Sequence, residues 1–358
     1  MVNKIKFLSN VFKDRNILVI GHTGFKGAWL SIWLHESGAN VAGFSLESYE
    51  NDYIFRASKL GSKVNDERGD IRSFKQLQKI FAEYKPEIVF HLAAQSLVRK
   101  SYNEPVGTFE TNIIGTVNVL ECIRLSDSVK SAIIVTSDKC YKNKNDGKSY
   151  KEDDELGGHD PYSASKACAE IVTGSYGNSF FGNSDKCIAS VRAGNVLGGG
   201  DFAKDRLVPD CIRALQKKEP IKIRNPDSKR PWQHVLEPIY GYMLLAEKLA
   251  KGQKRFAEAW NFGPDQSSTI TVKEVADLII RFWGEGKWIE VQESNEKMME
   301  TEVLSLDSTK ARKMLGWKPV WNINTTLSKT VDWYKKSNRE DAYKLCVKQI
   351  KEFTKKLN

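Results

Sequence analysis

The chain has 358 residues, 41% of them hydrophobic and 28% charged, a balance typical of a globular protein with one large domain and a smaller lobe. No apolar run approaches the roughly 18 residues that a membrane-spanning helix needs, and the first ten residues lack the apolar stretch of a secretion signal. The net charge of +10 comes from lysines spread along the whole chain, which favours a solvated surface over a nucleic-acid-binding face. We therefore expect a cytoplasmic protein that binds neither membrane nor nucleic acid.

The six cysteines do not form CxxC pairs, and no histidine lies near them at the spacing of a zinc site. A chain of this length builds its own apolar core and does not depend on disulfides. The sequence therefore predicts free, buried thiols and no metal.

The first half of the chain alternates predicted strands with predicted helices. Residues 16–20 form a short apolar run that stops at a glycine, which is typical of a buried strand. After it, Trp29, Ile32 and Trp33 share one helical face, and Gly38 provides a C-terminal stop. Further strands are expected at 41–44, 88–92 and 132–136, and helices at 73–84, at 105–125 and after Pro161. This alternation predicts a Rossmann-type, doubly wound parallel sheet.

Beyond about residue 195 the alternation loosens. Helical patterns recur at 208–217, 235–250, 272–283, 309–315 and 325–334, separated by loops and short strands. We predict a cofactor-binding domain over residues 14–195 and a smaller C-terminal α/β lobe over residues 196–358 that binds substrate. The boundary is approximate, because segments of the later half can return to the sheet.

A glycine-rich turn, Gly21-His22-Thr23-Gly24-Phe25-Lys26-Gly27, follows the first predicted strand and opens a helix. Glycines allow a tight turn and a close backbone approach to a pyrophosphate, while the helix N-terminus adds amide donors. The spacing is GxxGxxG, which departs from GxGxxG. Its position between a strand and a helix predicts a dinucleotide site.

Other parts of that site follow later strands. Asp70 and Ile71 come after a third β-like segment and are expected to flank the adenine, and small residues at 92–95 let a cofactor lie against the backbone. No acidic residue stands at Ser45, where a ribose-binding carboxylate is expected, although Glu47 is a possible substitute. No arginine lies there to bind a 2′-phosphate, so NAD is favoured over NADP. The predicted cofactor-binding residues are Gly21, Thr23, Gly24, Phe25, Lys26, Gly27, Asp70, Ile71, Leu92, Ala93, Ala94, Gln95, Tyr162 and Lys166.

Tyr162 and Lys166 lie four residues apart and therefore share one face of a predicted helix. A neighbouring ammonium favours the phenolate and lowers the pKa of the tyrosine, which can then accept a proton from a hydroxyl. Ser137 stands at the carboxyl end of a predicted strand, where ligands of such sheets bind. Together the three residues predict a site that activates a hydroxyl group.

Asp138 and Lys139 follow Ser137 directly, at the same strand end. A simple alcohol dehydrogenase needs only the serine. Removing water from a sugar needs a base at the carbon and an acid at the departing hydroxyl, and these two side chains can supply them. The alternative interpretation of the pair is an ordinary polar loop.

Several polar residues downstream are candidates for substrate contacts. The guanidinium groups of Arg206 and Arg230 suit a diphosphate, although each is individually more typical of a protein surface. Asn195 ends another predicted strand, and His234 lies shortly after Arg230. The predicted substrate-binding residues are Gln95, Ser137, Asn195, Arg206, Arg230 and His234.

At these motifs the sequence resembles the extended short-chain dehydrogenase/reductases and, among them, the nucleoside-diphosphate-sugar 4,6-dehydratases. The glycine turn, residues 137–141, 192–201 and 226–238 resemble the branch that acts on CDP-glucose, and the similarity runs from about residue 14 to about 333. Sister branches acting on dTDP-glucose and GDP-mannose carry an Asp-Glu pair where this chain has Asp138-Lys139. That departure leaves open which group is the base.

The resemblance implies a reaction cycle on tightly held NAD. In that cycle Tyr162 deprotonates the C4 hydroxyl and hydride leaves C4. Water is then lost across C5 and C6, with Asp138 protonating the leaving hydroxyl and Lys139 a candidate at C5, and hydride returns to C6. The resemblance also implies a homodimer or homotetramer assembled through helices around 105–125 and 162–180.

Two other functions remain open from the sequence. A nucleotide-sugar 4-epimerase would share Ser137, Tyr162 and Lys166 but has no need of an acid/base pair at 138 and 139. A nucleotide-sensing or RNA-binding protein on a retained scaffold would fit the basic charge, but such a protein can lose the tyrosine and lysine without harm. The intact trio argues against that second alternative.

Overall fold

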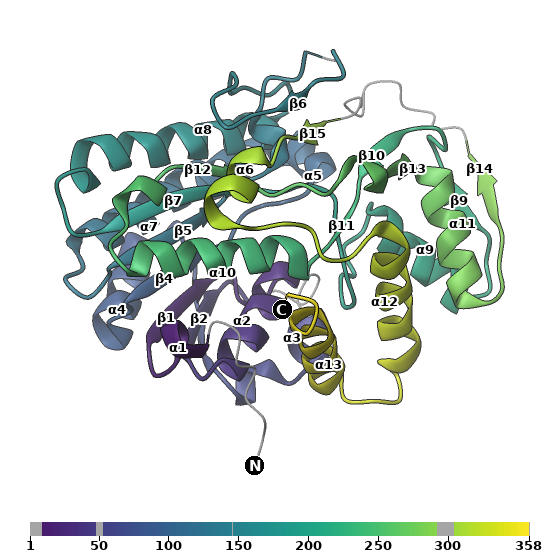
Figure 1. Cartoon of the computed structure of the whole chain (residues 1–358), viewed down its shortest axis with the longest axis horizontal. Coiled ribbons are helices and arrows are strands. Elements are labelled where there is room, and N and C mark those ends of the chain that lie inside the picture. Colours follow the sequence, from purple (N-terminus) through teal and green to yellow (C-terminus); the bar gives the residue numbers. More distant parts are fainter. Residues whose placement is uncertain (1–8, 48–52, 145, 292–303, 358) are drawn as a thin grey trace.

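The computed structural model describes residues 9–47, 53–144, 146–291 and 304–357. In these ranges a parallel sheet of seven strands, in the order β12-β7-β5-β4-β1-β2-β3, forms the centre of the molecule (Figure 1). Its strands are β1 (Asn16–Ile20), β2 (Asn40–Ser45), β3 (Asn65–Arg68), β4 (Ile88–His91), β5 (Ser131–Val135), β7 (Cys187–Arg192) and β12 (Ala259–Asn261). The predicted Rossmann-type parallel sheet is confirmed. The strand order reverses between β1 and β4, which is where such sheets bind ligands.

Both faces of the sheet are buried. In β1, Ile17 and Val19 join one apolar cluster, and Leu18 and Ile20 join a second cluster on the opposite face. This alternation explains why the strand is a continuous apolar run. The first face packs against α2 (Phe25–Glu36), α10 (Leu236–Ala250) and α13 (Ala342–Thr354), and the second against α4 (Phe74–Tyr84), α7 (Gly115–Leu125) and α8 (Pro161–Tyr176).

A smaller lobe lies beside the sheet, on the right in Figure 1. Two short sheets, β9 (Ile221–Ile223) with β14 (Trp288–Glu290) and β10 (Lys229–Pro231) with β13 (Thr269–Thr271), pack with α9 (Leu207–Gln216), α11 (Val272–Trp283) and α12 (Ile323–Lys336). Later segments also return to the central domain, since β12 extends the sheet and α10 packs on it. The domain boundary near residue 195 stays a prediction.

The helix predicted over 105–125 is divided in the structure. It begins as α6 (Pro105–Phe109), widens into a π-helical turn over Glu110–Ile114 and continues as α7. The predicted helix at 309–315 is a single π-helical turn over Ala311–Leu315. None of the helices in the described ranges is both long and apolar enough to cross a membrane. The remaining elements are α1 (Ser9–Phe12), α3 (Tyr53–Ala57), α5 (Val98–Asn103), β6 (Ser149–Tyr150), β8 (Val196–Leu197), β11 (Gln233–His234) and β15 (Ser305–Leu306).

Candidate active site

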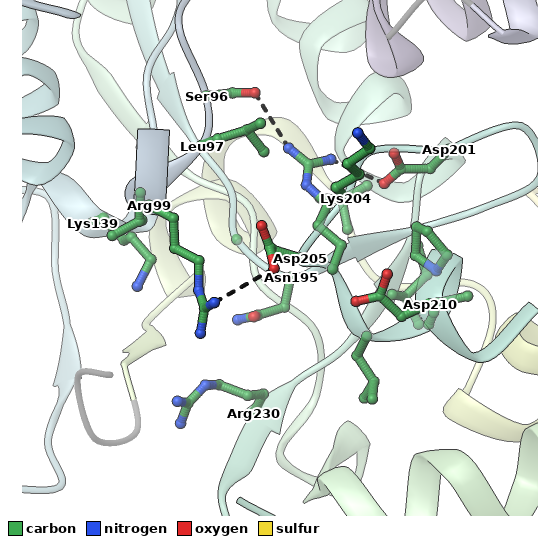
Figure 2. Close-up of a pocket in the computed structure, with 18 of the residues that line it drawn as sticks. Ser96, Leu97, Arg99, Lys139, Asn195, Asp201, Lys204, Asp205, Asp210 and Arg230 are labelled. Atoms are coloured by element: carbon green, nitrogen blue, oxygen red, sulfur yellow. Dashed lines mark hydrogen bonds and ion pairs between the residues drawn. The ribbon is translucent and has the colours of Figure 1, made fainter. Parts of the chain in front are cut away.

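A cavity of about 600 Å³ opens at the carboxyl ends of the central strands, between the sheet and the smaller lobe (Figure 2). The sheet domain contributes Ser137, Asp138 and Tyr162 to its wall, and the lobe side contributes Arg206 and Arg230. Residues as far apart in the sequence as Phe25 and Val272 therefore face one space. Its location agrees with the rule that open α/β sheets bind ligands beyond the carboxyl ends of their strands.

The glycine turn has the shape that a dinucleotide needs. Gly21 has a φ of +95°, and a Cβ there would lie 2.5 Å from the backbone nitrogen of Ala93. A Cβ on Gly27 would lie 2.0 Å from the carbonyl oxygen of Gly21, so both positions are closed to any side chain. Gly24, at the N-terminus of α2, differs: the nearest atom to its Cβ would be that same oxygen, at 3.5 Å. The open space over Gly24 fits a phosphate group on the helix N-terminus.

The end of β2 carries a polar network in place of the expected carboxylate. The ring of His22 contacts Ser45 Oγ at 3.0 Å and Asp66 Oδ1 at 2.8 Å, and Arg68 holds the other oxygen of Asp66 at 2.9 Å. The histidine and the guanidinium donate to Asp66, and its pKa is lowered despite partial burial. The expectation that no arginine lies at this strand end is wrong. Arg68 comes from β3 and pairs in register with Ser45, which the spacing along the chain did not reveal.

Asp70 and Ile71, the pair predicted to flank the adenine, lie just beyond β3. Both carboxylate oxygens of Asp70 are engaged, one by the backbone nitrogen of Arg72 at 2.9 Å and the other by its guanidinium at 2.6 Å. Ile71 is buried in the cluster that underlies this edge of the sheet. Residues 92–94 follow β4, with Leu92 and Ala93 hydrogen-bonded to β1 next to Gly21. These positions surround the glycine turn, and their contact with a cofactor stays a prediction.

Gln95 does not lie on the cavity wall, contrary to the expectation that it binds substrate. Its side-chain amide donates to the carbonyl of Leu97 at 3.1 Å and to Thr108 at 3.0 Å, and accepts from the nitrogen of Leu97 at 2.6 Å. The amide therefore shapes its own loop. Ser96 and Leu97 line the cavity in its place.

Ser137 and Tyr162 line the cavity and are almost fully buried. Lys166, one helical turn after Tyr162, is equally buried and donates to the carbonyl of Val135 at 3.3 Å. Their joint role at a hydroxyl group stays a prediction. Burial raises the pKa of Tyr162 to about 12, while a hydrogen bond with Ser137 acts in the opposite direction. The expected lowering of the phenol pKa is therefore wrong for the protein alone, because loss of hydration outweighs the neighbouring charges. Burial, followed by the charge of Lys26, lowers the pKa of Lys166 to about 8.

Helix α8, which carries the tyrosine and the lysine, begins at a defined residue. The Asp160 carboxylate accepts from the backbone nitrogen of Ser163 at 2.9 Å and from its hydroxyl at 2.6 Å, and Pro161 occupies the first helical position. Such a cap satisfies amides that the helix leaves unpaired. The cap therefore fixes the point at which α8 begins, and with it the position of Tyr162.

Asp138 and Lys139 lie in a tight turn that Ser137 caps. The serine hydroxyl donates to Asp138 Oδ1 at 2.9 Å and accepts from the backbone nitrogen of Lys139 at 3.2 Å. A Cβ at Gly194 would lie 1.9 Å from Asp138 Oδ2, so a glycine is required beside the carboxylate. Both members of the pair line the cavity, and Figure 2 shows Lys139 there. Asp138 is 6% exposed, so the alternative of a solvated polar loop does not describe it.

The side chain of Lys26 extends from the glycine turn to the cavity. Its side chain lines the cavity together with Asp138 and Tyr162. Burial, followed by the charge of Arg206, lowers the pKa of Lys26 to about 8, while the carboxylates of Asp138 and Asp201 act in the opposite direction. The sequence assigned Lys26 only to the cofactor, because its distance from the strand ends gave no signal.

The substrate-side wall carries more basic than acidic side chains, and several of its arginines pair with Asp201 or Asp205. Arg206 is held by Asp201 at 2.9 Å and reaches Ser96 at 3.3 Å, while Arg230 extends from β10 (Figure 2). Sequence reasoning missed other basic residues of this wall, although Arg224 directly follows β9, which was a usable signal. The added basic residues are Arg99, Lys100, Lys204, Lys222 and Arg224.

The other two substrate candidates differ in placement. Asn195 lines the cavity in a left-handed conformation with a φ of +49°. His234 is fully buried between the rings of Trp29 and Trp321, at centroid distances of 5.9 and 4.7 Å, and its Nδ1 accepts from the nitrogen of Leu236. The prediction that His234 contacts substrate is therefore wrong, because the side chain of His234 points from β11 into the core.

Comparison with known proteins places this arrangement among sugar-nucleotide enzymes. A family model described as GDP-mannose 4,6 dehydratase matches residues 18–330. A CDP-glucose 4,6-dehydratase from Salmonella typhimurium is 44% identical over 346 residues, covering 95% of this chain and 96% of the relative.

Solved structures share the fold. A dTDP-glucose 4,6-dehydratase from Bacillus anthracis, in complex with NAD, is 22% identical, with a TM-score of 0.77 over 90% of this chain and 97% of that one. A UDP-glucose 4-epimerase from Thermotoga maritima, with UDP-glucose, is 23% identical, with a TM-score of 0.78 over 90% of this chain and 100% of that one. At this identity the likeness describes the fold alone.

Proposed function

This chain belongs to the GDP-mannose 4,6 dehydratase family, and from that premise we propose that it converts CDP-D-glucose to CDP-4-dehydro-6-deoxy-D-glucose, as an NAD-dependent hydro-lyase. The 44% identity to a CDP-glucose 4,6-dehydratase over nearly the full length of both chains supports the substrate. The chain is accordingly an extended short-chain dehydrogenase/reductase that acts on a nucleotide sugar.

The observation that carries the proposal is the shared cavity of Tyr162, Ser137 and Asp138 beneath a basic wall. Tyr162 and Ser137 hold the C4 hydroxyl and exchange its proton. Asp138, within 2.9 Å of the serine hydroxyl, is placed to protonate the C6 hydroxyl as it departs. The basic wall, with Arg206 and Arg230, binds the diphosphate through charge-assisted hydrogen bonds.

The residues present fit NAD. Gly24 leaves room for a phosphate on the N-terminus of α2, and Gly21 and Gly27 let the backbone close around it. Bound NAD supplies the acceptor for the C4 hydride and its return to C6, so the cycle has no net redox change. Residues 92–94 lie beside this turn, and Lys166 orients the reacting end from α8.

Lys139 is the candidate for the C5 proton. Its side chain lines the cavity one residue after Asp138. The ketone at C4 acidifies the C5 proton, so a weak base in the right position is sufficient. A 4-epimerase uses the tyrosine, serine and lysine but no acid at C6, and the burial of Asp138 in the cavity favours the dehydratase.

We also propose that the protein is a homo-oligomer. Four apolar side chains stand exposed on neighbouring segments of the α6–α8 face: Val106 at 68%, Ile171 at 58%, and Ile114 and Phe180 at 50% each. Such a patch on a globular protein is typical of a protein interface. A symmetric dimer would cover it with the same patch of a second copy. The cytoplasmic location expected from the sequence stays a prediction.

Incubation with CDP-glucose and NAD, followed by reduction with borodeuteride, tests the reaction class. A dehydratase yields a 6-deoxy sugar that takes up one deuterium at C4. An epimerase yields galactose with no stable ketone to trap. Recovery of CDP-galactose without a 6-deoxy product would show that the chain is a 4-epimerase and not a dehydratase.

A further inference from the structure

Helix α8 carries a third buried charged residue that the proposed mechanism does not use. Glu170 follows Lys166 by four residues, as Lys166 follows Tyr162, so the three side chains lie along one face of the helix. Glu170 is 5% exposed. An ionised carboxylate at this depth needs partners, because burial without them is costly.

The partners of Glu170 come from two strands. One carboxylate oxygen accepts from the hydroxyl of Thr136, which directly precedes Ser137 at the end of β5. The other accepts from Ser190 at 2.7 Å and from Arg192 at 2.8 Å, both on β7. A single side chain therefore ties the helix of Tyr162 and Lys166 to β7 and to Thr136, which lies between the end of β5 and Ser137.

Arg192 extends the same network. Its guanidinium also donates to the hydroxyl of Tyr141 at 2.6 Å and to the carbonyl of Glu152 at 2.9 Å. The arginine lowers the pKa of Glu170 in spite of burial, so the residue is a carboxylate at neutral pH. The negative charge is thus permanent over the range in which the enzyme would work.

Four ionisable groups face Lys166 from the elements around it. Lys26 of the glycine turn and Glu170 of α8 carry opposite charges. Cys140, after Ser137, has a pKa raised well above its usual value by burial, and burial lowers the pKa of His91 on β4 to about 3, so both are neutral near pH 7. Of these four groups, Glu170 is therefore the one whose charge counteracts the effect of Lys26 on the pKa of Lys166.

We propose that Glu170 is the positioning residue of this reaction centre. Its carboxylate fixes α8 against the end of β5 and offsets the repulsion between the ammonium groups of Lys26 and Lys166. Glu170 touches neither the substrate nor the cofactor and acts through Lys166 and Tyr162. The inference rests on the proposed function, because the step that Lys166 serves is oxidation at C4.

The test follows Lys166 itself, in the full-length protein. The ¹³Cε chemical shift of labelled lysine, assigned by loss of the signal in Lys166→Met, gives the midpoint of its titration without any substrate. Glu170→Gln should lower that midpoint by about one pH unit, since an opposite charge nearby typically shifts a pKa by about 1–3 units. Lys26→Met should raise it. Ser190→Ala is the matched control, because it removes one hydrogen bond to Glu170 but no charge, and should leave the midpoint in place.

Loss of Glu170 also leaves Arg192 buried without its partner, which can prevent folding. If Glu170→Gln does not fold, Glu170→Gln/Arg192→Met removes both charges. The midpoint should still fall, but by less than in the single variant, because loss of the guanidinium charge acts in the opposite direction. In wild type and variant, the pH at which single-turnover C4 oxidation levels off should move with the midpoint. An unchanged midpoint, or a midpoint that moves while the oxidation profile does not, overturns the inference. If wild type fails to oxidise CDP-glucose, the proposed function fails, while the titration still reports on Glu170 and Lys166.

Discussion

The hydroxyl of Ser137 donates a hydrogen bond to Oδ1 of Asp138 at 2.9 Å. In the proposed mechanism, this contact joins the residue that holds the C4 hydroxyl to the residue that delivers a proton at C6. Consecutive residues of one turn would then serve oxidation and dehydration, and variants of the two should separate the steps.

Replacing Asp138 with asparagine should stop the cycle after oxidation. The amide keeps the size of the side chain but cannot protonate the leaving hydroxyl, and positioned acid catalysis typically contributes about 10²–10⁴-fold. We expect enzyme-bound NADH to accumulate in a single turnover, followed by a 6-deoxy product formed more slowly by that factor. Absorbance of the reduced cofactor measures the first step, and mass spectrometry the second.

Tyr162→Phe is the matched variant for the earlier step and should leave NAD unreduced.

Lys139→Met should slow exchange of the C5 proton with deuterated solvent if the lysine transfers that proton. Near-normal dehydration by both Asp138→Asn and Lys139→Met would make the pair an ordinary polar turn and favour the epimerase.

Gly24 offers a clean test of the cofactor site. A valine there meets no atom closer than 3.5 Å at its Cβ and occupies the space assigned to the pyrophosphate. Gly24→Val should fold with a melting temperature near that of wild type and lose NAD binding, measured by calorimetry. Gly27→Ala is the contrasting variant, because its Cβ meets backbone at 2.0 Å and should cost stability. Normal NAD affinity in a folded Gly24→Val protein would contradict the site.

Arg230 should contribute to binding of the diphosphate. A charge-assisted hydrogen bond contributes about 1.5–3 kcal/mol, and about 1.4 kcal/mol corresponds to a factor of ten in affinity. Arg230→Ala should therefore raise KM for CDP-glucose about tenfold or more with little change in kcat. Lys229→Ala, the neighbour on β10 outside the cavity, is the control and should match wild type. Equal kinetics for both variants would show that Arg230 does not bind the diphosphate.

The pH dependence of C4 oxidation should report Tyr162 and Lys166 together. Transfer to Tyr162 needs the phenolate, whose fraction rises about tenfold per pH unit below a pKa of about 12. The ammonium of Lys166 is retained below about pH 8 and lost above it. The single-turnover rate should therefore rise with pH up to about 8 and level off beyond it. A rate that is flat between pH 6 and 8 would show that proton transfer to Tyr162 does not limit this step.

The exposed apolar patch predicts the effect of a charge at its centre. Ile171→Glu should dissociate the oligomer, since a carboxylate in a symmetric interface meets its own copy. Light scattering coupled to size-exclusion chromatography measures the mass. Lys348→Glu, at an exposed position of α13 on the opposite face of the sheet, is the control and should keep the mass of wild type. A monomeric wild type would contradict the interface.

The apolar runs were sufficient to predict β1, β2, β4 and β5, because strands buried on both faces give a clear pattern. Strand β12, which is three residues long, was not predicted. Helix α13 was missed, since its partner α2 lies more than 300 residues earlier in the chain. In the site, Ser137, Asp138 and Tyr162 were predictable from local spacing at strand ends. The place of Lys26 in the cavity, of Arg68 beside Ser45 and of Glu170 against Thr136 and Arg192 was not, because these neighbours are distant in sequence. His234 was misassigned, since a histidine between two tryptophans gives no local sign of burial.

The most direct test of the central claim is one mass spectrum. Equal amounts of CDP-, dTDP-, GDP- and UDP-glucose are incubated together with the protein and NAD, and the nucleotide sugars are analysed at low conversion. The account predicts loss of one water from CDP-glucose well before the other three react. Loss of water chiefly from dTDP-glucose, or recovery of all four with unchanged mass, would contradict it.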